Sequence, residues 1–282
     1  MRAAESACSE NAADKAADQA AGLRRLIAAR DPGMLALSGA DADSYAPLAL
    51  DLAAASERDG RRVLLLDLTR GGLARHMGRT MQGYTMQGRT MRYELMHVID
   101  AHKRLDEVVA VGPRGVPLLP AARGVRALAN AWRGRSRFAD FVERAGGAPQ
   151  LVLAVAPAEE LETLARLAAF ATLLVVGAEG GVDLKVCYAA LKRAHAAGAA
   201  HAAAPRLIYA GGLDAEAAQR AHGRLMETSR AFLGGEPELV GRLVAGGMRE
   251  RREPAAQRSF PSLSVDQLAR AVLRWPLPPI SR

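Results

Sequence analysis

The chain has 282 residues, of which 50% are hydrophobic and 4% aromatic, so leucine, valine and alanine must fill a sizeable core, which fits one large domain. The formal net charge of +8 comes mostly from scattered arginines. Because no basic run is interleaved with aromatics, the charge does not indicate a nucleic-acid-binding protein, and an acidic partner or an anionic membrane surface fits it at least as well.

The first residues, MRAAESACSENAADKAADQAAG, are polar and rich in alanine. They lack the apolar core of a secretory signal, and the longest apolar runs of the chain are far below the roughly 20 residues that span a bilayer. We therefore expect a cytoplasmic protein with a disordered tail at 1–17. Cys8 and Cys187 lie far apart in the sequence and indicate neither a disulfide framework nor a zinc site.

Residues 18–30 predict a short amphipathic helix. Leu23, Leu26 and Ile27 share one helical face, and an Asp-Pro-Gly turn ends the helix before the first strand. From periodicity alone, such a face is more typical of packing on the chain's own domain than of binding a partner.

From residue 33 to 282, short apolar runs alternate with helical segments. The predicted strands are 34–38, 62–67, 116–121, 151–156, 172–177 and 206–211, and the predicted helices are 45–60, 158–170, 182–198, 214–235 and one near the C-terminus. Because several strands are almost continuously apolar, helices must cover both faces of the sheet, which predicts a mostly parallel, doubly wound α/β fold. Ligands of such sheets bind at the carboxyl ends of the strands, where Ser38 and Asp67 fall.

The segment RTMQGYTMQGRTMRYE repeats a TMQG unit and places Met81, Met86 and Met91 five residues apart. That spacing matches neither a helix face nor a strand face. We interpret the repeat as a lengthened surface loop, with a methionine-rich binding surface as the less favoured alternative.

Several of these segments resemble the flagellar MinD-like ATPases, the FlhG/FleN branch of the deviant-Walker ParA/MinD family. The resemblance rests on DQAAGLRRL at 18–26, on the following strand, loop, helix and RRVLLLD, on residues 94–128 and 186–195, and on RSFPSLSVDQLARAV. It covers about residues 18–275 and implies a MinD-type, P-loop NTPase-like fold. Only the DQAxxLR-like motif is specific to the flagellar branch.

The family's phosphate loop, Ser-Gly-Lys-Gly-Gly-Val-Gly-Lys-Thr, aligns on residues 38–46. Ser38 and Gly39 match it, but Ala40 and Tyr45 replace its two lysines, and alanine replaces its magnesium-binding threonine. In such loops, glycines let consecutive backbone N–H groups curl around an anion whose charge lysine neutralises. We therefore expect this loop to bind nucleotides poorly.

Acidic residues in and near this loop also disfavour nucleotide binding. Asp41 and Asp43 would face a polyanion at this loop, and like charges roughly 4 Å apart repel by about 4 kcal/mol at an effective dielectric constant of about 20. Asp67 and Gly71 match the family's Asp-x-Asp-x-Gly motif, but Thr69 replaces its second aspartate.

Two further family positions are lost, since Val155 replaces the Walker B aspartate and Ala210 the asparagine that reads adenine. The resemblance therefore implies the fold without ATP hydrolysis. We expect no catalytic residue, no metal site and no cofactor; ATP and Mg²⁺ enter only through the resemblance. His97, His102 and His195 show no ligand spacing and are expected to be ordinary surface or half-buried residues.

In the flagellar branch, the DQAxxLR-like motif stimulates a signal-recognition-type GTPase, FlhF. The partner-binding residues that the resemblance implies are Asp18, Gln19, Leu23, Arg24, Leu26 and Ile27. The apolar residues would dock in a groove of the GTPase and an arginine would pair with its acidic rim. Gln19 would orient the attacking water, and Asp18 would cap the helix.

Three functions remain open. The first is an ATP-free activator of the flagellar GTPase, which would control the number or position of flagella. The second is an ATP-dependent dimer that cycles on the membrane, and the third is a scaffold for flagellar switch or transcription regulators. The segment from Val265 to Trp275 is a candidate membrane-binding helix, which would place the protein at the inner membrane or cell pole, although packing on the core is favoured.

Overall fold

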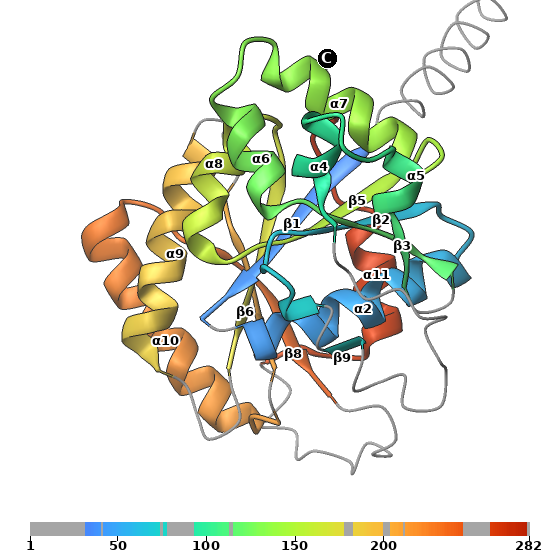
Figure 1. The fold of residues 1–282 in the computed structure, drawn as a ribbon. Helices are drawn as coiled ribbons and strands as arrows, with labels where there is room; N and C mark the ends of the chain where they lie inside the picture. The colour runs from blue at the N-terminus through green and yellow to red at the C-terminus, as the bar shows by residue number, and fades with distance from the viewer. Residues whose placement is uncertain are drawn as a thin grey trace, which may run out of the picture.

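The computed structural model describes residues 32–40, 42–73, 76–77, 93–112, 115–177, 183–199, 204–210, 212–244 and 260–280, with the backbone alone at 43 and 199 (Figure 1). The expected tail at 1–17, the expected helix at 18–30 with its six partner-binding residues, and the TMQG repeat lie outside these ranges, as does Asp41.

The described strands form one nine-stranded sheet in the order β3-β4-β2-β5-β1-β6-β7-β8-β9. In that order, the strands are Ala110–Val111, Pro117–Pro120, Val63–Asp67, Leu151–Val155, Gly33–Gly39, Ala171–Val176, Arg206–Tyr209, Glu238–Leu243 and Ser262–Leu263. All neighbouring pairs are parallel except β3 with β4. This arrangement confirms the predicted mostly parallel α/β fold.

Helices cover both faces of the sheet (Figure 1). The helices are α2 (Ala42–Arg58), α4 (Leu95–Ile99), α5 (Leu105–Val108), α6 (Ala122–Ala129), α7 (Gly134–Ala145), η2 (Ala158–Glu160), α8 (Leu161–Ala165), α9 (Leu184–Ala199), α10 (Ala215–Leu233) and α11 (Val265–Val272). One core lies between the sheet and α6 to α10, and the other lies beneath α2 and α11. Neighbouring residues of the central strands alternate between the two cores, as Ala36 and Leu37 do, because successive side chains point to opposite faces.

The six predicted strands are confirmed to within one or two residues at each end. The two edge strands, β3 and β9, and the neighbouring strand β8 were not predicted. β8 reads Glu-Leu-Val-Gly-Arg-Leu and is mostly half-buried, so it carries no apolar run. Its Gly241 has a φ of +146°, and an added Cβ would lie 2.6 Å from the carbonyl oxygen of Pro261, so glycine is required by the close approach of that segment.

The predicted helix at 158–170 was too long, since only Leu161–Ala165 is α-helical, after the short turn η2. The longest helix of this face, α10, has clear boundaries. The Asp214 side chain accepts a hydrogen bond from the backbone N–H of Ala217 at 2.6 Å at the start of α10, and Gly234, with a φ of +66°, ends it.

The C-terminal helix α11 packs on the core, as the sequence favoured. Leu268, Ala269 and Val272 are fully buried, and they share the core that lies beneath α2. An ion pair between Arg58 and Asp266 joins the two helices at their surface. The apolar face of α11 is therefore not presented to a membrane. In the described part of the chain, none of the helices combines the length and hydrophobicity that crossing a bilayer requires.

We expect Leu268→Ala to lower the free energy of unfolding by about 2–4 kcal/mol, because it opens a cavity in a fully buried contact. Arg270, two residues further along the helix, is exposed and serves as a matched control. Arg270→Ala should change the free energy of unfolding by no more than about 0.5 kcal/mol. Denaturant titration measures both. Equal, small effects of the two variants would show that α11 does not contribute to the core.

Candidate functional site

The structure brings three of the sequence-predicted site residues to one edge of the sheet. Ser38 and Gly39 end β1, and Asp67 ends β2. Both strands pair with β5, where Val155 lies opposite Asp67 on one side and Leu37 on the other. Gly71 follows in the loop after β2, with a φ of +92°. The edge is the one at which sheets of this type bind ligands.

At this edge, the connection between β1 and α2 is too short for a phosphate loop. The strand ends at Gly39 and the helix begins at Ala42, so Ala40 and Asp41 alone join them. The helix had been predicted to start at Tyr45. Residues 42–46, which align with most of the family's loop, have helical backbone and so cannot curl around a phosphate.

The side chain of Tyr45 explains why the helix starts early. It is 1% exposed and belongs to the core beneath α2, with Leu37 and Leu48 in the same cluster. Pro47 is tolerated best in the first turn of a helix, which favours a later start. Burial of the Tyr45 ring offsets this preference, since a fully buried aromatic side chain removes 150–250 Å² or so from water.

Gly39 matches the family's loop but has a different role here. A Cβ at this position would lie 2.7 Å from the carbonyl oxygen of Val175 on β6 and 3.0 Å from the ring of Tyr45. Glycine is therefore required because strand, helix and ring approach one another closely. The ring occupies the position at which the family has its phosphate-binding lysine.

The residues at this edge do not fit a magnesium nucleotide. Val155 is fully buried and apolar, and Ala210 lies at the end of β7. Neither can bind a cation or read a base. Among the described residues, no group of three His, Cys, Asp or Glu side chains could hold a metal ion.

Asp67 shapes the loop after β2. Its Oδ1 accepts hydrogen bonds from the backbone N–H and the hydroxyl of Thr69, at 2.7 and 2.5 Å. The Thr69 Oγ1 in turn accepts one from the backbone N–H of Leu73 at 2.9 Å. Asp67 therefore orders this turn, with Thr69 as its hydrogen-bond partner.

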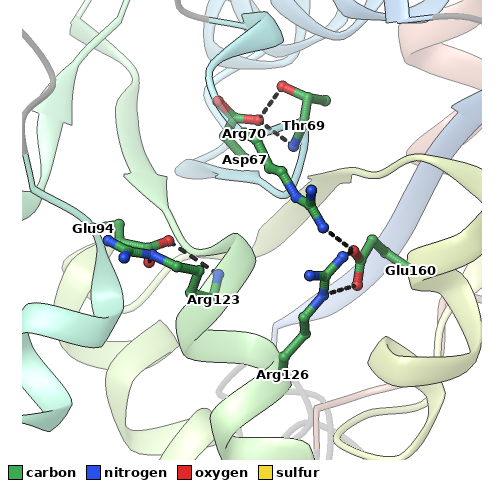
Figure 2. Close-up of polar contacts among 7 residues, drawn as sticks. All are labelled: Asp67, Thr69, Arg70, Glu94, Arg123, Arg126 and Glu160. Atoms are coloured by element: carbon green, nitrogen blue, oxygen red, sulfur yellow. Dashed lines mark hydrogen bonds and ion pairs between the residues drawn. The ribbon is translucent and has the colours of Figure 1, made fainter.

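An ion-pair cluster that the sequence had not indicated lies beside this loop (Figure 2). Glu160, in η2, is 2% exposed. Both its carboxylate oxygens accept hydrogen bonds from Arg126 on α6, with Nε to Oε2 at 3.0 Å, and the Arg70 Nη2 lies 4.0 Å from Oε1. A buried carboxylate is costly unless it is paired and hydrogen-bonded, so Arg126 stabilises its burial.

A second ion pair joins Glu94 to α6 on the other side of the loop (Figure 2). The Glu94 carboxylate accepts a hydrogen bond from the backbone N–H of Arg123 at 3.0 Å and pairs with its guanidinium. The arginines of the two clusters, Glu94 and Asp67 line a cavity of about 480 Å³. Because Arg123 and Arg126 already have carboxylate partners, the cavity is not a preformed anion site.

Among the described residues, Cys187, His222 and His97 have structural contacts. Cys187 lies on α9, as predicted, and burial raises the pKa of its thiol to about 11, so a reactive thiolate is not formed near neutral pH. The Tyr209 hydroxyl lies 3.2 Å from Nδ1 of His222 on α10, and burial lowers the pKa of that imidazole. His97 accepts a hydrogen bond from the backbone N–H of Glu94 at the start of α4.

Comparison with solved structures identifies the fold. The chain is similar to MinD of the MinC:MinD cell division protein complex of Aquifex aeolicus, with a TM-score of 0.55, 15% identity and coverage of 87% of this chain and 98% of that one. The MinD cell division protein of the same organism matches with a TM-score of 0.54 and 13% identity, over 87% of this chain and 99% of that one. A plasmid partition protein from Borrelia burgdorferi matches with a TM-score of 0.54 and 12% identity, over 86% of this chain and 99% of that one.

These similarities define a MinD/ParA-type α/β fold over most of the chain. No model of a protein family matches the sequence, and no curated protein sequence matches it. The shared feature is therefore the arrangement of strands and helices.

Restoring the family's lysine tests the closed loop. We expect Tyr45→Lys to lower the free energy of unfolding by about 3 kcal/mol or more, because an uncompensated ammonium would be buried. It should not create binding of a fluorescent ATP analogue in the presence of Mg²⁺. The control Tyr45→Phe keeps the ring and should cost less than about 1.5 kcal/mol. A stable Tyr45→Lys variant that binds the analogue would contradict a closed site.

The neighbouring residues Glu159 and Glu160 offer a matched pair of variants, since the first is exposed and the second is buried beside Arg126. Glu160→Gln should lower the free energy of unfolding by about 1–3 kcal/mol, because a charged partner loses its carboxylate. Glu159→Gln should leave it unchanged. Thermal unfolding of both variants at one pH measures the two effects. Equal midpoints would contradict the stabilising role of the Glu160–Arg126 pair.

Proposed function

We propose that this chain is a nucleotide-independent regulatory protein with a MinD/ParA-type fold. The observation that carries the proposal is the two-residue connection between β1 and α2, with Tyr45 buried where the family has its lysine. A protein of this fold that lacks a phosphate loop must act through its surfaces. The MinD of Aquifex aeolicus occurs in a complex with MinC, so the fold is compatible with action through a partner protein.

The proposed partner is the flagellar signal-recognition-type GTPase, and the proposed contact is the N-terminal segment 18–30. Support for this step comes from the sequence DQAAGLRRL, which resembles the GTPase-stimulating motif of the flagellar MinD-like ATPases. The side chains of Leu23, Leu26 and Ile27 bind a groove, and Arg24 pairs with an acidic rim. Gln19 orients the attacking water, which is an effective form of assistance because phosphoryl transfer depends mainly on positioning and charge stabilisation.

In this proposal, residues 1–17 form a tail, residues 18–30 form the activating element, and residues 33–282 form its carrier domain. The carrier needs neither ATP nor Mg²⁺, and the protein controls the number or position of flagella from the cytoplasm. Two alternatives use the same fold. An ATP-dependent membrane-cycling dimer requires a phosphate loop, which the buried Tyr45 argues against. A scaffold for flagellar switch or transcription regulators requires no activation.

GTP hydrolysis by the flagellar GTPase of the same organism tests the proposal. We expect the full-length chain to stimulate it without ATP, and Gln19→Ala and deletion of residues 1–30 to abolish the stimulation, because both remove the water-orienting carboxamide. Asp14→Ala changes the preceding tail and should retain full stimulation. Binding without stimulation would instead identify a scaffold.

A second experiment tests whether the protein depends on ATP. Light scattering should give a monomer with and without Mg-ATP, and ATP should not alter GTPase stimulation. A shift to a dimer with Mg-ATP would overturn nucleotide independence and favour the membrane-cycling alternative.

A further inference from the structure

An open groove lies between α5 and the C-terminal end of α7, on the face of the sheet that α6 to α10 cover (Figure 1). Its volume is about 840 Å³. The floor is apolar and consists of Val98, Leu105, Val109, Phe141 and Ala145. Leu105 is buried and the other four are half-buried, so aliphatic and aromatic carbon faces the solvent here. We call these five residues the α5–α7 groove.

Charged side chains form the rim of the α5–α7 groove, and most of them are paired with one another. Lys103 Nζ lies 3.0 Å from Oε1 of Glu107. The Arg104 guanidinium donates two hydrogen bonds to Asp106, at 3.0 and 2.8 Å. Arg144 adds one exposed cation from α7. Because the paired charges offset one another, the rim favours neither a strongly acidic nor a strongly basic ligand, and the apolar floor determines what binds.

The N-terminal segment joins the described part of the chain close to this groove. The Gly33 N–H donates to the carbonyl of Gln150 at 3.1 Å, and Gln150 follows Ala145 of the groove by five residues. Five residues span at most roughly 17 Å. The turn between them is compact, since the N–H of Ala148 donates to the carbonyl of Glu143 at 2.9 Å. The start of β1 therefore lies near one end of the groove.

The length of chain before β1 suffices to reach the groove. The predicted helix at 18–30 lies outside the described residues and ends just before Pro32. Its last large apolar residue, Ile27, precedes Gly33 by six residues, which span up to about 20 Å when extended. A short tether holds a segment at an effective concentration on the order of millimolar near any site within reach. A contact that is weak between separate molecules is therefore sufficient within one chain.

The apolar residues of this segment match the floor of the groove. Leu23, Leu26 and Ile27 have the i, i+3, i+4 spacing with which an amphipathic helix fills an apolar groove. We infer that residues 18–30 dock this face in the α5–α7 groove of their own chain.

The consequence of the docking rests on the proposed function. The three apolar residues that occupy the groove are those that would bind the GTPase, so the two contacts exclude each other. The GTPase must compete with the groove, and a segment that is docked nine-tenths of the time binds it about tenfold more weakly. The folded domain thereby limits the activity of its N-terminal segment without using a nucleotide.

Alkylation of single thiols in the full-length chain tests the docking without the GTPase. In a Cys8→Ser background, Ala20→Cys and Ala21→Cys form a matched pair, because position 20 shares the predicted helical face of Leu23 and position 21 lies on the other side. Cys187 is retained in both, since its burial and its pKa of about 11 keep it unreactive. We expect iodoacetamide to modify the thiol at 20 about tenfold more slowly than the thiol at 21, which corresponds to docking for nine-tenths of the time.

Changes in the groove and in the segment should remove this difference. Phe141→Ser takes an aromatic side chain from the floor, and Leu23→Ser with Leu26→Ser leaves the groove intact but removes the docking face. Either change should make the two rates equal. Phe232→Ser is the matched control, since Phe232 is exposed on α10, outside the groove, and it should preserve the tenfold difference. Circular dichroism verifies that Phe141→Ser is folded.

The GTPase supplies a separate readout. Phe141→Ser should reach half-maximal stimulation at a roughly tenfold lower concentration than the unchanged chain, because the segment is no longer docked. Protection of the thiol at 20 without stimulation by any variant would support the docking and reject the proposed function.

Three outcomes would overturn the inference. Equal alkylation rates at 20 and 21 in the otherwise unchanged chain would show that the segment is not docked. A rate difference that increases with protein concentration would place the segment on a second copy of the chain. A difference that persists in folded Phe141→Ser would place the segment on another surface.

Discussion

Tyr45, in the first turn of α2, packs against the end of β1, and this contact determines the backbone conformation at the usual position of a phosphate loop. β1 is the central strand on which both cores depend, and α2 crosses directly above it. Because Gly39 lacks a side chain, the Tyr45 ring packs against the strand and reaches the core. A helix that starts this close to the strand leaves no room for a loop. The same packing that stabilises the centre of the sheet therefore gives residues 42–46 a helical backbone in place of the loop that curls around a phosphate.

Charge is distributed unevenly along α6 and the residues that follow it. On the helix, Arg123 and Arg126 lie beside Glu94 and the buried Glu160, so their charges are satisfied within the protein. Past its end, Arg133, Arg135 and Arg137 follow one another, and the first carboxylate after them in the sequence is that of Asp140. The net charge of +8 therefore does not by itself indicate where an acidic partner would bind. What matters for binding is where carboxylates do not accompany the arginines.

The sequence predicted the central part of the fold well, because continuously apolar strands can only be buried between two layers of helices. It predicted the edge strands poorly. β8 and β9 depend on the approach of Pro261 to Gly241, a contact between segments with no apolar periodicity. The start of α2 was predicted three residues late, because local preference at Pro47 favours a shorter helix while the burial of Tyr45 favours a longer one. Tertiary packing outweighs local propensity here.

The sequence by itself determined which residues stand where the resemblance aligns the family's lysines, Walker B aspartate and adenine-reading asparagine, namely Ala40, Tyr45, Val155 and Ala210, since these are matters of residue identity. It also predicted six of the nine described strands, to within one or two residues at each end. Only the tertiary structure decided that Tyr45 fills the vacated position, that Arg126 pairs with Glu160 across 34 residues, and that α11 turns its apolar face inward. It also decided that Trp132 remains in solvent. The reason is that burial and ion pairing depend on which segments meet in space, and one-dimensional periodicity specifies the faces of an element but not its neighbours.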